Sequence, residues 1–482
     1  MGNRMKLSRR RFIGNTGAVA AGFVGLHRYL NQGQVHGADF SYPVTKREAH
    51  QSEVKGYGEL LVDPKRILDL PEGFQYTVMS STGEIMSDGL RVPGAPDGMA
   101  AFPLDSDRCV VICNHELEDK QTFQGPYGVT NDLASQVPTG KMYDTGKGQY
   151  PQLGGTSSFV FNLKRQSVES HFLSLAGTIR NCAGGPTPWG SWISCEETVW
   201  VAGDHLDHNH GYNFEVPATA KMGLCDPIPL KAMGRFNHEA VAVDPASGIV
   251  YQTEDREDGL ITRFIPKVPG KLAEGGRLEA LAVKGTPSCD TRNWPDKGTP
   301  HIAVGSSLDV EWMPIEDTEN LEDTMRADMF KAGSAIFARG EGMWYGTGKI
   351  YFACTSGGLG KGGQVFVYEP SPHEGTSHES RQPGRLTLYL EPNNTHLLQY
   401  GDNLTVAPWG DVVLCEDGAD DQYLRGVTPE GKIYTLARNS YFGKSELCGV
   451  CFSPYESTLF VNIQRPGITL AVKGPWESLA KS

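Results

Sequence analysis

Apolar and polar positions alternate in short runs along the chain, and one arrangement of them returns six times. An apolar run of strand length is followed by a tight turn, a second apolar run and then polar or acidic residues. The six copies are 102–116, 187–197, 243–255, 343–356, 406–417 and 452–464. Short β-branched and aromatic runs separated by Pro, Gly and Asp turns are typical of β-hairpins. The pattern therefore predicts six hairpins.

Further strand-like runs lie between the hairpins, at 158–163, 262–265, 364–368 and 432–437. Six recurring β units with uneven spacing favour an all-β, six-bladed β-propeller, in which insertions become loops. A β-sandwich with accessory loops is the alternative. The stretches 119–150, 266–330 and 369–396 look too polar or irregular for blades. We expect them to be loop and short-helix insertions that cap one face, with one short helix near 319–329.

The first forty residues form a separate unit. Ser8 is followed by three arginines and Phe12, and then by an apolar run of small residues that ends at Leu26. This pattern predicts a twin-arginine export signal over residues 1–38, recognised by the twin-arginine translocase. A basic amphipathic helix is the alternative. The run is too short and interrupted for a membrane span.

The remaining chain is then divided in two. Residues 39–89 are expected to form an N-terminal extension with the first propeller strands, and residues 90–482 the propeller domain. The predicted location is the periplasm, or outside the cell by the same pathway. The ten cysteines permit disulfides there, but no pairing follows from their spacing.

Charge narrows the possible partners. The formal net charge is -13, and residues 1–37 contain six basic side chains and no acidic ones, so the rest of the chain carries about -19. Nucleic acids and anionic membrane surfaces attract basic proteins, so the acidic charge argues against both as the main partner. Bound cations would offset this charge; a solvated acidic surface is the alternative.

Two sets of polar residues flank the predicted hairpins. If the hairpins are blades, equivalent positions surround one axis, and both sets meet at one end of it. The residues that end the second strands are 114–116, 195–197, 254–255, 354–356, 416–417 and 462–465. The residues that precede the first strands are Asp97, Asn181, 238–239, 339–341, 402–403 and Glu446.

Carboxylates gathered in this way repel one another unless cations bridge them. Clusters rich in oxygen ligands favour hard ions such as Ca²⁺ or Mg²⁺, and a thiolate among them favours iron or another transition metal. Unconnected acidic residues at the surface ends of six hairpins are the alternative. Recurrence at equivalent positions favours the metal cluster.

Several of these segments resemble the PhoX-type alkaline phosphatase family, in the same order from about residue 90 to 470. They are 190–197, 235–239, 253–256, 339–342, 410–418 and 459–464. The resemblance implies a six-bladed propeller that hydrolyses phosphate monoesters with about two iron ions and about two or three calcium ions at its centre. One departure is the fourth hairpin, which ends in Cys354, Thr355 and Ser356 without an acid.

The resemblance also implies roles for individual residues. Cys195 matches an iron-ligating cysteine, and Glu254, Glu341 and Asp417 match the carboxylates of other blade ends. The metal or neighbouring positions carried over less directly are Glu116, Glu196, Glu239, Asp402 and Asn403. Arg339 is expected to clamp the phosphoryl oxygens, unless it is an ion-pair partner of a carboxylate. His238 is expected to act as a general acid, unless it is a structural histidine.

Two rival functions remain open on the sequence. One is a calcium-dependent propeller lactonase or phosphotriesterase, which needs no thiolate. The other is a propeller without enzymatic activity, in which the acids hold structural calcium and the surface binds a partner. For the favoured phosphatase we expect a small phosphoester substrate and a monomeric protein.

Overall fold

The computed structural model describes residues 50–298, 301–442, 445–455 and 458–478. The predicted export signal therefore lies outside the described residues. Antiparallel strands make up most of the regular structure, and the one described α-helix is α2 (Met325–Ala332), which overlaps the predicted short helix. None of the described helices has the length and apolar character needed to cross a membrane.

The strands fall into six groups, which we call blades 1 to 6. Each blade is a set of neighbouring antiparallel strands, which follow one another along the chain except for the last strand of blade 6. Blade 1 contains β4 (Pro96–Pro103), β5 (Arg108–His115), β6 (Gly154–Asn162) and β7 (Ser167–Thr178), and blade 2 contains β8 (Asn181–Pro186), β9 (Ser191–Glu196) and β10 (Asn213–Pro217). Blade 3 contains β11 (His238–Val243), β12 (Val250–Glu254), β13 (Ile261–Pro266) and β14 (Gly276–Val283).

The later blades repeat this order. Blade 4 contains β16 (Gly340–Gly346), β17 (Lys349–Cys354), β18 (Gln364–Glu369) and β19 (Arg385–Leu390). Blade 5 contains β20 (Gly401–Val406), β21 (Val412–Glu416), β22 (Tyr423–Val427) and β23 (Ile433–Asn439). Blade 6 contains β24 (Leu447–Phe452), β25 (Leu459–Ile463), β26 (Ile468–Lys473) and, from the other end of the chain, β3 (Gln75–Ser81).

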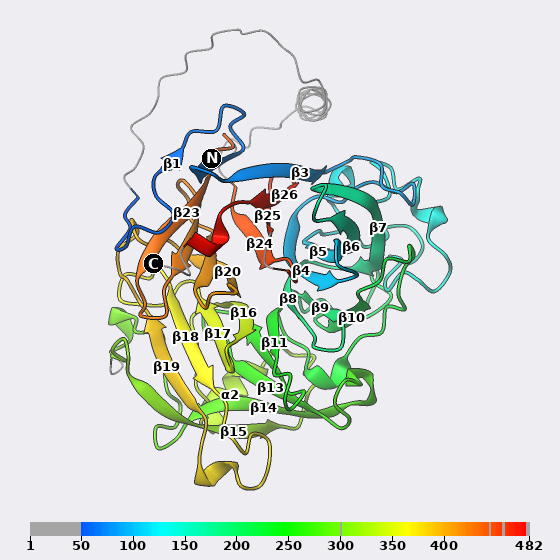
Figure 1. Cartoon of the computed structure of the whole chain (residues 1–482). Helices are drawn as coiled ribbons and strands as arrows, with labels where there is room; N and C mark the ends of the chain where they lie inside the picture. The colour runs from blue at the N-terminus through cyan, green and yellow to red at the C-terminus, as the bar shows by residue number, and fades with distance from the viewer. Residues whose placement is uncertain (1–49, 299–300, 443–444, 456–457, 479–482) are drawn as a thin grey trace, which may run out of the picture. The chain divides into compact units, whose positions relative to one another are not determined.

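The first strands of the blades form a closed ring around one axis (Figure 1). β4, β8, β11, β16, β20 and β24 contact one another in that order, and β24 contacts β4. The strands approach closely: a Cβ on Gly98 would lie 2.6 Å from Ala183 Cα, and one on Gly342 would lie 2.6 Å from the Leu404 amide nitrogen. The predicted all-β propeller is confirmed.

Blades 3 and 4 are joined into one nine-stranded sheet. β15 (Ser307–Ile315) pairs with β14 on one side and with β19 on the other. β14, β15 and β19 lie in stretches that the sequence pattern indicated as insertions, and that prediction was wrong for them. These strands lie away from the axis, and most side chains of β15 are exposed or half-buried, so no apolar run marks it.

The N-terminal strands attach to the last two blades. β3 pairs with β26 and completes blade 6, while β1 (Leu60–Leu61) pairs with β2 (Leu68–Pro71), which pairs with β23 of blade 5. The two ends of the described chain therefore meet in the same part of the propeller.

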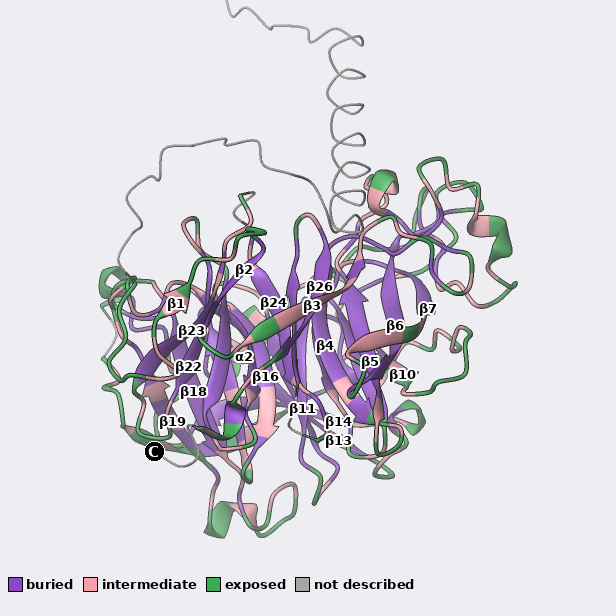
Figure 2. Ribbon diagram, turned by 45° about the horizontal axis from the view of Figure 1, so that its top comes forward, coloured by how far each residue is buried: buried purple, intermediate pink, exposed green. Residues whose placement is uncertain are grey.

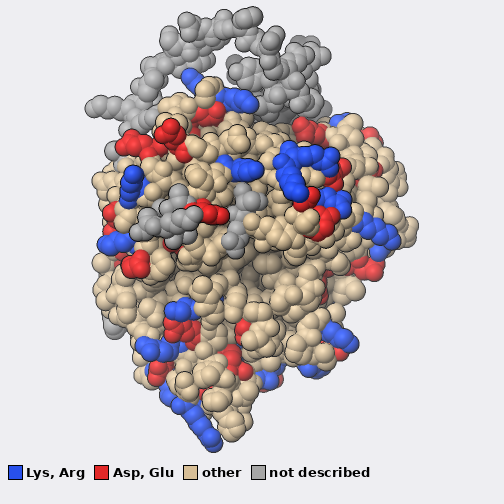
Figure 3. Space-filling view, in the orientation of Figure 1, with Lys and Arg blue, Asp and Glu red and all other residues tan. Residues whose placement is uncertain are grey.

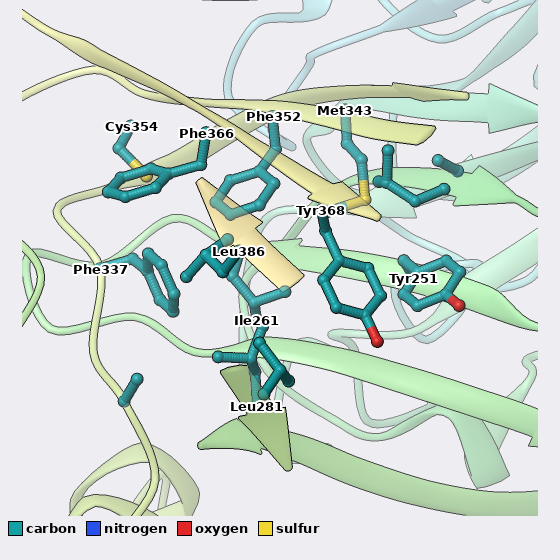
Figure 4. Packing of buried hydrophobic residues seen from close by; sticks show 14 of the residues in the cluster. Tyr251, Ile261, Leu281, Phe337, Met343, Phe352, Cys354, Phe366, Tyr368 and Leu386 are labelled. Carbon is teal, nitrogen blue, oxygen red and sulfur yellow. The ribbon is translucent and has the colours of Figure 1, made fainter. Parts of the chain in front are cut away.

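The apolar core lies between the blades rather than at the axis. Figure 2 shows that the interior strands are buried along most of their length. Between blades 3 and 4, Tyr251, Ile261 and Leu281 pack towards Phe352 and Phe366 (Figure 4). Full burial of such a side chain contributes about 1.5–3 kcal/mol. Packing between blades thus fixes the ring that positions the strand ends.

Candidate metal centre

Every first strand carries an irregularity near its beginning. The register with the second strand shifts within the first few residues of β4, β8, β11, β16, β20 and β24. A β-bulge of this kind redirects a side chain. In each of five blades, the second residue of the first strand, directly after the residue at which its pairing with the second strand begins, has a carboxylate or a thiol side chain. These residues are Asp97, Cys182, Glu239, Glu341 and Asp402. In blade 6, Glu446 directly precedes the strand.

A second set of equivalent residues directly follows the second strand of each blade. These residues are Glu116, Glu197, Asp255, Thr355, Asp417 and Gln464. Each donates its backbone N–H to the carbonyl of the residue before the first strand of its own blade, over 2.9–3.3 Å. The acceptors are Ala95, Arg180, Asn237, Arg339, Tyr400 and Glu446. The same local geometry therefore recurs in all six blades.

The two sets meet at the axis. Ligand atoms of Glu116, Cys182 and Glu197 lie within 4.8 Å of one another. The same spacing holds in three groups made of carboxylates alone, which share members: Asp97, Glu116 and Glu446; Glu239, Glu341 and Asp402; and Asp402, Asp417 and Glu446. The thiol is close enough to Glu197 for a hydrogen bond, with 3.2 Å between Sγ and Oε2.

Burial makes this cluster costly to ionise. Desolvation, followed by the charge of neighbouring carboxylates, raises the pKa of Asp97, Glu239, Glu341 and Glu446 well above the ordinary range. Burial also raises the pKa of Asp402 to about 7 and that of Glu197 to about 8. Bound cations would favour the ionised forms and remove the mutual repulsion.

Two arginines border the cluster. Arg339 donates from Nε and Nη2 to the Asp255 carboxylate over 2.8 and 2.9 Å, and from Nη2 to Glu341 over 2.6 Å. Arg180 donates from Nη2 to Glu116 over 2.8 Å and also to Glu197. Both occupy the left-handed region, with φ of +54° and +48°. Ala95 and Tyr400, at the equivalent positions of blades 1 and 5, share this conformation with φ of +42° and +52°, so it is a recurring feature where a first strand begins.

The donors present fit metal ions. Oxygen ligands predominate, one thiol lies among them, and Asp97 Oδ1 is buried without a hydrogen-bond partner among the described residues. A buried polar atom without a partner is costly, and a cation would supply the missing interaction. By contrast, acidic and basic side chains are interspersed over the face shown in Figure 3. The carboxylates at the axis therefore differ from the charged side chains on this face in being buried.

Several residues selected from the sequence lie in this cluster. Glu116, Glu239, Glu341, Asp402 and Asp417 are all members. Arg339 is bonded to one of them. Asn403 lies beside them, since its Nδ2 donates to Asp402 over 3.1 Å and its Oδ1 accepts from the Gly449 amide over 2.7 Å.

Four selected residues lie elsewhere. Cys195 is buried in an apolar cluster with Ile193 and Phe264. The Glu196 carboxylate accepts from the backbone amides of Ile179 and Gly211. Glu254 accepts from the Leu260 amide over 3.0 Å.

His238 is also outside the cluster. Its Nε2 donates to the Gly234 carbonyl over 3.0 Å, and its ring stacks on Phe236 with 3.7 Å between centroids. Burial lowers the pKa of His238 to about 3. A neutral, enclosed imidazole of this kind is a structural histidine rather than a general acid.

Five residues of the site were missed, and two of them lie one position after a selected residue. Glu197 and Asp255 directly follow Glu196 and Glu254, and side chains on a strand alternate between its two faces. Asp97 and Glu446 belonged to the set before the first strands but were not selected as ligands. Cys182 belonged to neither set. It could have been found by its position, because it is the second residue of its strand, as Glu239 and Glu341 are of theirs.

One buried histidine, His210, holds the strand end that carries Glu197. His210 is fully buried and lies between two carboxylates, 2.7 Å from Glu196 Oε1 and 3.2 Å from Asp144 Oδ2. It therefore connects the 119–150 segment to the strand that ends beside Glu197. Although burial opposes its charge, the two carboxylates raise the pKa of His210 to about 9.

Replacing this histidine is expected to destabilise the fold. His210→Gln should lower the free energy of unfolding by about 3 kcal/mol, because two buried carboxylates lose their cation. A pKa raised by folding favours the folded state below the ordinary value near 6.5, and that advantage disappears as the pH rises through about 9. Denaturant unfolding of the wild type and the variant at pH 6 and pH 10 measures the loss of stability and its dependence on pH. An equal deficit at the two pH values would contradict this account.

Fold and site together define a β-propeller with candidate metal sites at its axis. The chain belongs to the alkaline phosphatase PhoX family, whose sequence pattern matches residues 55–467. The protein is therefore a phosphatase, as the resemblance implied, in a metal-dependent family. No curated protein matches the chain.

A solved structure shares the fold, and others resemble it more distantly. Pseudomonas fluorescens PhoX in complex with vanadate, a transition state analogue, is 14% identical, with a TM-score of 0.61 over 85% of this chain and 96% of that one. A luciferin-regenerating enzyme (9% identity, 84% and 96% coverage, TM-score 0.37) and a gluconolactonase from Xanthomonas campestris (10%, 83% and 98%, 0.35) are more distant.

Proposed function

We propose that this protein is an exported, monomeric phosphatase that hydrolyses phosphate monoesters at a cluster of iron and calcium ions on the propeller axis. The observation that carries the proposal is the position of Cys182. Its thiol lies within metal-ligand spacing of Glu116 and Glu197, and a thiolate among carboxylates favours iron over calcium.

The groups made of carboxylates alone support calcium. Asp97, Glu116 and Glu446 form one such group, and Asp402, Asp417 and Glu446 form another. Calcium takes six to eight oxygen ligands in flexible geometry, which suits shared carboxylates from several blades. The Asn403 side chain orients Asp402 through the bond from its Nδ2.

The bound cations would supply the positive charge that offsets a phosphate dianion and lowers the pKa of water. The chain's own contribution is positioning. Asp255 and Glu341 hold the Arg339 guanidinium through Nε and Nη2. Nη1 takes part in no hydrogen bond with the described residues and is the atom proposed to donate to the phosphoryl group.

Export and oligomeric state are part of the same proposal. The arginines before Phe12 support the twin-arginine pathway, and the periplasm or the cell exterior is the proposed location. The monomer is supported by the closed ring, to which one chain supplies every blade.

The proposal predicts metal content and activity together. Elemental analysis of the folded protein should find about two iron ions per chain and more calcium than iron. Hydrolysis of p-nitrophenyl phosphate should accompany this content and increase when calcium is added to a depleted sample. Calcium without iron, and no turnover of the monoester at full metal occupancy, would overturn the proposal.

A further inference from the structure

One position of the second set differs from the others in chemistry. Four of the six residues that follow the second strands are acids and one is the amide Gln464, whereas blade 4 supplies Thr355. The Gln464 amide is used, because its Nε2 donates to Asp97 and Glu116 over 3.2 and 3.0 Å. Thr355 therefore brings a neutral hydroxyl to a ring made otherwise of acids and one occupied amide.

The backbone places Thr355 as it places the acids. Its N–H donates to the Arg339 carbonyl over 3.0 Å, just as the Asp255 and Asp417 amides donate to Asn237 and Tyr400 over 3.1 and 3.0 Å. The residue before it, Cys354, pairs with Gly340 at the start of blade 4. Thr355 thus stands at the axis beside the strand that carries Glu341.

The hydroxyl has no partner within the described part of the chain. Thr355 is 2% exposed, and Oγ1 is buried without a hydrogen bond to any described group. A buried hydroxyl left unpaired is unfavourable, and in a native protein it calls for an explanation. A ligand at the axis would supply the partner.

We propose that Thr355 is a further substrate-binding residue, whose Oγ1 donates a hydrogen bond to a non-bridging oxygen of the phosphoryl group. A neutral hydroxyl is a weak metal ligand compared with the surrounding carboxylates, but it is a good donor to an anionic oxygen. Thr355 and Arg339 share one backbone hydrogen bond, so blade 4 presents two hydrogen-bond donors to the ring. This inference rests on the proposed phosphatase function.

The test uses the metal-loaded, full-length protein and the isosteric variant Thr355→Val. With p-nitrophenyl phosphate, kcat/KM should fall about ten- to a hundredfold, as expected when one donor to a charged group is lost. The inhibition constant of orthovanadate should rise by a similar factor, with metal content unchanged. Thr355→Ser, which keeps the hydroxyl, should restore most of both values.

Ser334→Ala is the matched control. Ser334 is also fully buried, and its hydroxyl has no hydrogen-bond partner among the residues that the structure describes. It lies outside both sets at the axis, so its variant should match the wild type. If Thr355→Val stays within twofold in both kcat/KM and vanadate inhibition, or loses metal, the inference is wrong. An inactive wild type at full metal occupancy would instead refute the proposed phosphatase, so the two failures are distinguishable.

Discussion

Cys182→Ala is expected to lose iron and at least about a hundredfold in kcat/KM for phosphate monoesters, because even residues that only support metal ligands cost ten- to a hundredfold when replaced. The thiol is the one soft donor in the group formed with Glu116 and Glu197. Calcium should be retained in larger part than iron, because the remaining groups contain carboxylates alone. Elemental analysis and turnover of p-nitrophenyl phosphate measure both effects.

Cys195→Ala is the matched control for this experiment. Both cysteines are buried and lie on neighbouring strands of blade 2, β8 and β9. Cys195 packs among apolar side chains, so its replacement should cost about 1 kcal/mol of stability and leave iron and activity near wild-type values. Iron loss from the Cys195 variant alone would show that the thiol at the axis has been assigned to the wrong residue.

Removal of all metal by a chelator is expected to lower the melting temperature strongly, and more at pH 8 than at pH 5. Burial and mutual repulsion raise the pKa of Asp402 to about 7 and of Glu197 to about 8, and those of Glu239 and Glu341 rise as well. A carboxyl with a raised pKa favours the folded state at low pH. That advantage is lost as the pH rises from its ordinary value near 4 through the raised one.

The metal-loaded protein should show much less of this decline, because bound cations favour the ionised carboxylates at every pH in that range. Thermal unfolding of both forms from pH 5 to pH 8, with metal content checked at each pH, gives the comparison. Refilling with calcium should restore part of the difference at pH 8. Equal melting temperatures for the two forms at pH 8 would mean that the cluster is not a metal centre.

The propeller could be predicted from the sequence because its inner strands are buried. The first two strands of most blades lie between neighbouring blades and appear as apolar runs ending in acids. The signal is weaker in the strand that joins blades 3 and 4: β15 has only two buried residues, and its pairing with β14 and β19 depends on partners distant in sequence. The local alternation of apolar and polar residues does not predict the pairing of half-exposed strands that are distant in sequence.

Part of the candidate site lies at or next to residues selected from the sequence, and the alternation of side chains along a strand explains the one-residue differences. The acids at the ends of the second strands were found, but Glu196 and Glu254 bond to nearby backbone, while Glu197 and Asp255 point to the axis. Only the hydrogen bond that follows each second strand shows which of two adjacent acids does so. Cys182 was missed because the bulge that redirects it is defined by pairing rather than by residue type.

The seam between β3 and β26 sets an order for biosynthesis. The strand Gln75–Ser81 pairs with Ile468–Lys473, so the ring stays open on the ribosome until β26 has been synthesised. During that time β3 has an unpaired edge of the kind that invites aggregation. Closure therefore waits for β26, and a protein truncated before Ile468 would lose the strand that holds β3 in blade 6.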